Sequence, residues 1–323
     1  MKKALCVAVV TAMLAGPLAA APLNKARVSS LANWVLHVDS EQFAASRIGK
    51  LIRQEIRNSD IEPKLQDFAQ VFSFHPLDDI RNVTLYGRGK DPSLAVAMFQ
   101  GRYNQQTLAA VVGMNPFYEV YEYGGHTVHS WIDENKQKEG QEQRQYGAFY
   151  GQDTVLLSMG RPTLEHVLDV LDGKAQAMTY HPDLEDFQAE HEGTFLLVAA
   201  EEVDQTVAGL DESGIAQQTR RLALAVGEED ATTYVDITLE ALNSEAATKL
   251  AQIVMGLKAF VSLSVAEQEP ELAQMVEAIT IAWQDNVVRV HLAWDSQRLF
   301  ALLKTMAEKH GAHVEQAVSM NMP

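Results

Sequence analysis

Cysteine is almost absent from this chain, which has a single one, Cys6, among 323 residues. Cys6 lies in the short apolar stretch Ala4–Ala15, which follows the basic residues Lys2 and Lys3. A basic start, a short apolar stretch and small residues before a cleavage point are typical of a secretory signal peptide, whereas a membrane anchor needs about 20 apolar residues. We therefore expect export and removal of residues 1–21. The mature chain would then have no disulfide bond, no thiol nucleophile and no thiolate metal site.

Positive charge is scarce as well. The chain has 26 Lys and Arg against 43 Asp and Glu, so its formal net charge is −17 at pH 7. A surface of this sign repels polyanions, which excludes nucleic acid and anionic lipid headgroups as main partners. The acidic residues are spread along the chain, as on a solvated surface. No apolar run after the signal peptide approaches about 18 residues, so we expect no transmembrane span in the mature chain.

Sequence motifs for catalysis are missing too. The chain contains no phosphate-binding loop, no Gly-x-Ser-x-Gly elbow, no His-Glu-x-x-His helix and no dinucleotide fingerprint. These absences do not exclude an enzyme, but they make catalysis the less favoured interpretation. No cofactor is predicted.

The clearest structural pattern in the chain is Gln145–Asp172. Apolar residues alternate on both sides of the turn Gly151–Asp153, which predicts a β-hairpin, and a stripe of apolar residues at helical spacing follows Gly160. A hairpin followed by a helix is also predicted at residues 82–112, 220–263 and 278–309.

The whole pattern occurs twice, as strand, helix, hairpin, helix, hairpin and helix. Trp34–Asp39 opens the first copy and Gly193–Ala199 the second, with Gly173–Glu192 as the boundary between them. The predicted fold class is therefore α+β, with two pseudo-repeated lobes at residues 22–190 and 191–323. Each lobe would consist of antiparallel hairpins followed by helices packed on one face of the sheet.

Aromatic residues are concentrated on the predicted strands between residues 118 and 150. Tyr121 and Tyr123 are two apart on one strand and share a face, and Trp131 lies on the next strand. Aromatic side chains are enriched at binding surfaces, so these three are candidates for a ligand-binding platform. Core packing or cross-strand pairing is the simpler interpretation of the same pattern.

Histidines and carboxylates are densest at the boundary between the lobes, where His181, Asp183 and His191 could hold a divalent cation. A charged surface linker is the simpler interpretation of such a composition. His37 and Asp39 are two apart on the first strand, and their spacing predicts that both lie on a polar, solvent-facing surface.

The opening strand, Asn-Trp-Val-Leu-His-Val-Asp-Ser, resembles that of a group of uncharacterised exported bacterial proteins. These begin their mature domain with a Trp-x-x-His-x-Asp strand and later carry a strand like His129-Ser130-Trp131. The resemblance covers mainly Trp34–Asp39 and His126–Trp131. It implies export to the periplasm or beyond, and it brings no activity and no catalytic residues.

Three functions are compatible with these patterns. The leading interpretation is a non-catalytic envelope protein that binds another protein or a small ligand, through a cleft between the lobes or through the aromatic strands. The alternative is a metal-dependent hydrolase with His181, Asp183 and His191 as ligands. A carrier of apolar molecules is the third, and it requires a large apolar cavity, which a sequence does not reveal.

Overall fold

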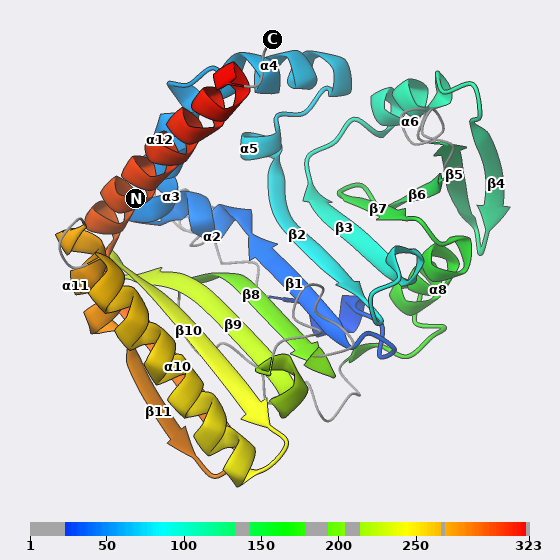
Figure 1. The fold of residues 1–323 in the computed structure, drawn as a ribbon. Coiled ribbons are helices and arrows are strands. Elements are labelled where there is room, and N and C mark those ends of the chain that lie inside the picture. Colours follow the sequence, from blue (N-terminus) through cyan, green and yellow to red (C-terminus); the bar gives the residue numbers. More distant parts are fainter. Residues whose placement is uncertain (1–22, 133–142, 179–192, 204–213, 266–268, 321–323) are drawn as a thin grey trace, which may run out of the picture.

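One antiparallel sheet of twelve strands runs through the part of the chain that the structure describes (Figure 1). The structure is a computed structural model that describes residues 23–132, 143–178, 193–203, 214–265 and 269–320. The strand order is β11-β12-β10-β9-β8-β1-β2-β3-β7-β6-β5-β4. The strands are β1 (Trp34–Asp39), β2 (Ile80–Gly87), β3 (Ala95–Gly101), β4 (Glu119–Tyr123), β5 (His126–Ile132), β6 (Arg144–Tyr150), β7 (Thr154–Ser158), β8 (Thr194–Glu201), β9 (Thr219–Glu229), β10 (Thr232–Ala241), β11 (Thr280–Gln284) and β12 (Val287–Asp295).

Helices follow the hairpins, as the sequence predicts, and the protein belongs to the α+β class. Capping side chains define several helix starts: Asn104 accepts a hydrogen bond from the Thr107 N–H and Asn243 from the Ala246 N–H. The helices are α2 (Ser40–Ala45), α3 (Arg47–Arg57), α4 (Ile61–Phe72), α5 (Pro76–Asp79), α6 (Gln105–Gly113), α8 (Arg161–Leu171), α10 (Ser244–Val265), α11 (Pro270–Ala278) and α12 (Ser296–Met320), with short 3-10 helices at Lys25–Arg27, Pro92–Leu94 and Ala216–Gln218.

The two-residue turn between β4 and β5 lies where the glycine pair predicts it. Gly124 and Gly125 both have positive φ, at 63° and 97°. Side chains other than Gly, Asn and Asp rarely adopt this conformation, so the glycine pair fixes the turn and the register of the hairpin. Tyr123 is therefore opposite His126, and Tyr121 is opposite Val128.

The helices pack on both faces of the sheet, so the prediction of a single covered face is wrong. Alternate residues of a strand point to opposite faces. Leu156 of β7 is buried in a core cluster with Leu164 and Leu168 of α8. Its neighbour Leu157 points to the other face, where it shares a cavity with Leu108 of α6. Both faces of this half of the sheet are apolar enough to bind a helix.

His37 and Asp39 are buried, at 5% and 1% exposure, so the prediction of a solvent-facing position is also wrong. Nδ1 of His37 lies 2.9 Å from the hydroxyl oxygen of Thr84, and Asp39 caps α2 by accepting from the Gln42 N–H at 2.8 Å. Leu36, whose side chain points to the other face of β1, is half-buried. The polar side chains of this central strand are therefore inside and the leucine keeps contact with solvent.

The sheet is continuous across the predicted boundary between the lobes. β1 and β8 are antiparallel neighbours in its middle, with Leu36 opposite Val198 and Trp34 opposite Ala200. The boundary segment itself lies mostly in residues 179–192, outside the described residues.

Candidate functional site: an apolar cavity

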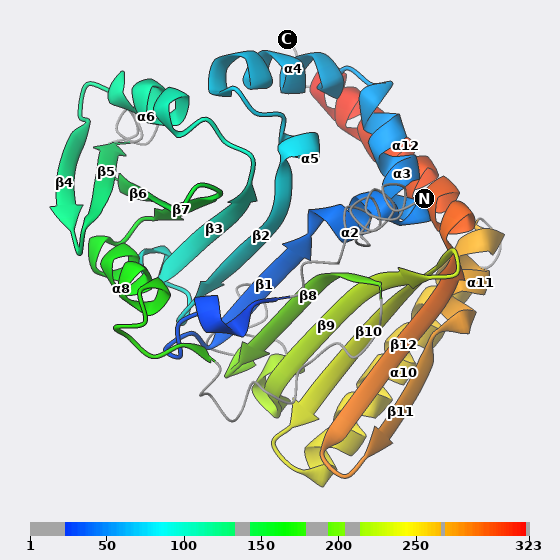
Figure 2. The ribbon, with the colours of Figure 1, turned by 180° about the vertical axis from the view of Figure 1, so that it is seen from behind.

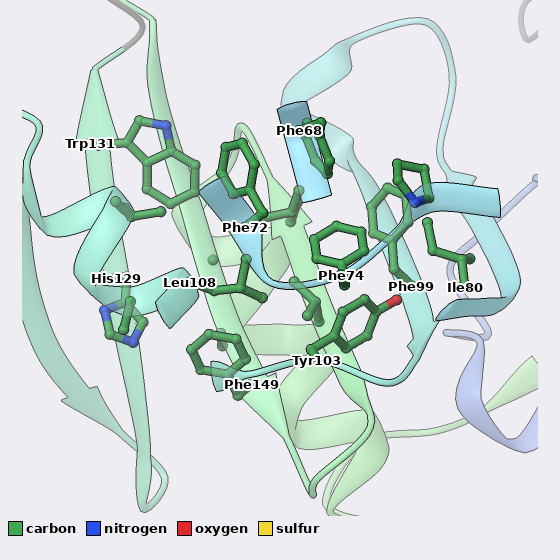
Figure 3. Close-up of a pocket in the computed structure, with 17 residues that line it drawn as sticks. Phe68, Phe72, Phe74, Ile80, Phe99, Tyr103, Leu108, His129, Trp131 and Phe149 are labelled. Carbon is green, nitrogen blue, oxygen red and sulfur yellow. The ribbon is translucent and has the colours of Figure 1, made fainter. Parts of the chain in front are cut away.

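A cavity of about 360 Å³ lies between the sheet and the helices α4 and α6 (Figure 3). One wall is formed by β3, β7, β6 and β5, and the opposite wall by α4, α6 and the segment that leads into α5. Its lining residues are Phe68, Phe72, Phe74, Pro76, Ile80, Phe99, Tyr103, Leu108, Ala109, Val112, His129, Trp131, Gly147, Ala148, Phe149, Val155 and Leu157. This volume lies within the range of small-molecule binding sites.

The helical wall is built from aromatic rings that pack on one another. Phe68 and Phe72 are one helical turn apart on α4 and stack with their ring centroids 4.3 Å apart. Phe74 meets Phe68 edge-on at 5.2 Å and Tyr103 edge-on at 5.1 Å. Such edge-to-face pairs fix ring orientation more strongly than aliphatic contacts do. This wall is therefore preformed without a ligand.

The sheet wall follows from strand register. Phe99 is opposite Val155, and Val155 is opposite Phe149, so their side chains emerge on one face in a row across β3, β7 and β6. Gly147 lies in the next row, where an added Cβ would come within 3.3 Å of the Trp131 ring and 3.2 Å of Leu157. The glycine thus makes room for the indole of Trp131 against the sheet.

Two ionisable side chains line the cavity, and both are uncharged at neutral pH. Burial lowers the pKa of the His129 imidazole below its ordinary value. The Tyr118 hydroxyl lies 2.7 Å from Nδ1 of His129. Burial also raises the pKa of Tyr103, and the Tyr103 hydroxyl has no hydrogen-bond partner among the described residues. A charged ligand group would find no ionic partner among the lining side chains.

The structure separates the three predicted platform residues. Trp131 lines the cavity, as a binding residue would. Tyr121 and Tyr123 lie on the other face of the sheet, against α8. The Arg161 guanidinium lies 4.1 Å from the centroid of the Tyr121 ring, and the Tyr123 hydroxyl donates to Asp169 at 2.8 Å. The two tyrosines do not form a platform with Trp131, because their contacts hold α8 on the sheet.

The predicted metal ligands His181, Asp183 and His191 lie outside the described residues. Within the described residues, no group of three or more His, Cys, Asp or Glu side chains could hold a metal ion. The metal site stays a prediction from the sequence.

Sequence reasoning missed the phenylalanines of the cavity. Phe68 and Phe72 both lie on α4, and their spacing of four residues places them on one helical face. That spacing indicates an apolar face. What it does not indicate is that the face meets β5, β6 and β7, which follow more than 50 residues later.

Helix α10 is long and apolar enough, by length and composition, to cross a membrane, although the sequence pattern predicted no further span. Its first half packs on the sheet, where Ala247, Leu250 and Ala251 are fully buried. Its second half exposes Leu257 at 52% and Phe260 at 69%. A core helix of a soluble protein passes the same composition test, so the prediction of no span stays open.

No family model matches the chain, and no curated protein matches it. Among solved structures, crystal form III of TP0453 is similar, with a TM-score of 0.51 and 10% sequence identity over 89% of this chain and 100% of that chain. Crystal form I has a TM-score of 0.44 over 89% and 99%, and crystal form IV 0.46 over 86% and 95%, both at 10% identity. The similarity to form III indicates a shared fold and supports no statement about function.

Proposed function

We propose that this chain is an exported, non-catalytic binding protein whose cavity takes the hydrocarbon part of a small ligand. The observation that carries the proposal is the lining of the 360 Å³ cavity, which contains no Asp, Glu, Lys or Arg. An apolar group that enters such a site leaves water and packs against aromatic and aliphatic side chains. This joins two of the functions that the sequence allows, a small-ligand binding protein and a carrier of apolar molecules.

The cavity supports binding rather than catalysis. The ionisable groups that line it are His129, whose pKa burial lowers, and Tyr103, whose phenol is uncharged at neutral pH in any surroundings. The one polar contact of His129 is to the Tyr118 hydroxyl, so no Ser, Cys or Asp nucleophile lies within its reach among the described residues. The metal-dependent hydrolase, with His181, Asp183 and His191, remains the alternative.

Export is supported by the sequence alone. The basic start and the short apolar stretch within residues 1–21 are the pattern of a cleaved signal peptide, and the mature chain lacks cysteine. We place the mature protein in the periplasm or outside the cell. Chains that begin at residue 22 after secretion, as measured by N-terminal sequencing, would support this placement.

The proposal includes a duplication of the two lobes. Outward from the middle of the sheet, the order is β1-β2-β3-β7-β6 on one side and β8-β9-β10-β12-β11 on the other. A helix follows the third strand of each series (α6 and α10) and another follows the fourth (α8 and α12). The hairpin β4–β5 would then be an insertion in the first copy. Superposition of the two halves in an experimental structure tests this relationship.

Binding is tested with the uncharged fluorophore N-phenylnaphthylamine, whose emission rises in apolar surroundings. Ala109 of α6 lines the cavity, and Ala110 beside it is exposed to solvent. Ala109→Phe is expected to weaken binding by ~tenfold or more, because its ring occupies the ligand volume, whereas Ala110→Phe leaves binding unchanged. Equal affinities of the two variants would refute the cavity as the site.

A further inference from the structure

A row of apolar side chains continues from the cavity across the middle of the sheet. Leu157, which lines the cavity, is opposite Ala97 of β3, and Ala97 is opposite Leu85 of β2. The row continues from Leu85 to Leu36 of β1 and from there to Val198 of β8. Residues directly opposite each other in an antiparallel pair share a face. All of these side chains therefore lie on the cavity side of the sheet.

The row reaches β9, where Val198 is opposite Leu224. We call Leu85, Leu36, Val198 and Leu224 the central apolar band. It crosses four strands, or about 14 Å at the usual spacing between neighbouring strands. All four side chains are half-buried, so each keeps contact with solvent.

In β1, which contributes Leu36 to the central apolar band, two polar side chains are buried while this apolar one keeps contact with solvent. On β1, the buried residues that flank Leu36 are Val35 and His37, and Asp39 beyond them is 1% exposed. The leucine keeps contact with water while the imidazole and the carboxylate do not. A contiguous apolar surface that keeps contact with solvent is a feature of ligand-binding grooves.

In Figure 1 the strands of the band, β2, β1, β8 and β9, lie between α10 and the helices α4 and α6. α10 packs on the same face of the sheet beyond the band, where Leu250 and Leu239 belong to one core cluster, and Figure 2 shows it behind β11 and β12. Helices therefore cover this face at both flanks, and the described helices leave the half-buried band between them.

The volume of the cavity limits what can enter it. A cavity of 150 Å³ holds a benzene-sized ligand, so 360 Å³ corresponds to about fourteen carbon atoms. The acyl chains of common lipids are longer. A longer chain therefore extends out of the cavity, and the apolar surface that continues from Leu157 is the central apolar band.

We infer that the protein binds a long-chain acyl lipid, with one part of the chain in the cavity and the remainder on the central apolar band. The inference rests on the proposed function and names its ligand class. The uncharged lining places the lipid headgroup outside the cavity, in solvent. The net charge of −17 favours a headgroup that is not anionic.

The test uses lysophosphatidylcholines, which carry one acyl chain and a zwitterionic headgroup, at concentrations below micelle formation. They compete with N-phenylnaphthylamine in a series of about ten to eighteen acyl carbons. In the native protein, affinity is expected to rise by roughly fourfold for each added methylene beyond about fourteen carbons, because each one is buried on the band. A rise that stops at about fourteen carbons in the native protein would overturn the inference and leave the proposed function intact.

Two variants place a polar group on the band. Leu36→Gln and Val198→Thr are each expected to lower the affinity for the longest chain by about tenfold while the shortest chain binds as in the native protein. Val198→Thr keeps a β-branched side chain with high strand propensity, so it still tests the band if Leu36→Gln proves to disturb the fold. Val71→Thr is the matched control, since Val71 lies on α4 at 53% exposure and does not line the cavity.

Other outcomes count against the inference. If no lysophosphatidylcholine of any length displaces the fluorophore, the long-chain ligand class is wrong. If the native protein does not bind the fluorophore at all, the proposed function is refuted. If Val198→Thr changes the sedimentation of the protein and leaves the chain-length series unchanged, the band is a contact between two copies of the chain.

Discussion

The hydroxyl group of Tyr118 lies 2.7 Å from Nδ1 of His129, with the two rings stacked at a centroid distance of 5.9 Å. Tyr118 precedes the edge strand β4, and His129 lies on β5 at the border of the cavity. The contact holds the imidazole against Phe149, whose ring centroid is 5.7 Å away. The cavity wall is thus fixed from outside by a residue that does not line it.

The buried imidazole makes stability depend on pH. The pKa of His129 is lower in the folded state than its ordinary value of about 6.5, so the unfolded state binds more protons below that pH. His129 therefore destabilises the fold as pH falls through about 6.5, and has no such effect above it. The free energy of unfolding of the native protein minus that of His129→Phe should fall between about pH 7.5 and pH 5, in denaturant titrations. A difference that is independent of pH would contradict this.

Glu228 joins three elements. Its carboxylate accepts hydrogen bonds from the backbone N–H groups of Arg47 and Ile48, the latter at 2.8 Å, and from the Ser296 hydroxyl at 2.6 Å. It caps the N-terminus of α3 and holds the start of α12 on β9. Glu228→Ala is expected to lower the free energy of unfolding by about 2–3 kcal/mol, because these donors lose a charged acceptor.

The neighbouring residue provides the control for this prediction. Glu229 is exposed at the end of β9, so Glu229→Ala should change the free energy of unfolding by less than about 0.5 kcal/mol. Equal losses for the two variants in denaturant titrations would mean that the contacts of Glu228 do not stabilise the fold.

Filling the cavity should raise stability while it removes binding. The ring of Ala109→Phe adds apolar contacts where the native protein has empty volume, which is expected to raise the free energy of unfolding by about 0.5–2 kcal/mol. The thermal midpoint should rise for Ala109→Phe and stay unchanged for Ala110→Phe. A loss of stability at Ala109 would mean that the wall formed by α6 cannot accept a larger side chain.

Chelation is expected to have no effect on the described fold. Within the part of the chain that the structure describes, no cluster of His, Cys, Asp and Glu could hold an ion. An ion at about 100 times its dissociation constant would stabilise by roughly 2.7 kcal/mol, enough to shift the midpoint by several degrees. A chelator-dependent midpoint, lost in His181→Ala and His191→Ala, would support the hydrolase alternative.

Local elements of this fold follow from the sequence. Gly124-Gly125 predicts the β4–β5 turn, and residues 145–172 form the predicted strand, strand and helix at β6, β7 and α8. These features depend on periodicity and turn chemistry within a few residues. The apolar spacing of Phe43, Ile48 and Ile52 is typical of one continuous helix, but the structure has two, because Ser46 is extended and its hydroxyl caps α3 by accepting from the Gly49 N–H.

The separation of Trp131 from Tyr121 and Tyr123 was predictable in principle. A two-residue turn at Gly124-Gly125 pairs Tyr121 with Val128, and Trp131 is three residues beyond Val128. An odd offset along a strand reverses the face. The turn and the strand alternation together therefore predict that Trp131 lies on the other face of the sheet from Tyr121 and Tyr123.

The cavity and the buried positions of His37 and Asp39 were not predictable from local patterns. The cavity depends on α4 meeting the strands β5, β6 and β7, and the burial of β1 depends on its pairing with β8, which begins 155 residues after it ends. A strand at the middle of a sheet is buried or exposed according to what packs on each face, and its own alternation does not specify which face that is.

The most direct test of the account is a crystal structure of the mature protein with a lysophosphatidylcholine that carries bromine at the end of its acyl chain. The account predicts an anomalous bromine peak inside the cavity, between α6 and the strands that carry Val155 and Phe149. Bromine bound only on the exposed half of α10, or an empty cavity in crystals that hold the lysophosphatidylcholine elsewhere, would contradict it.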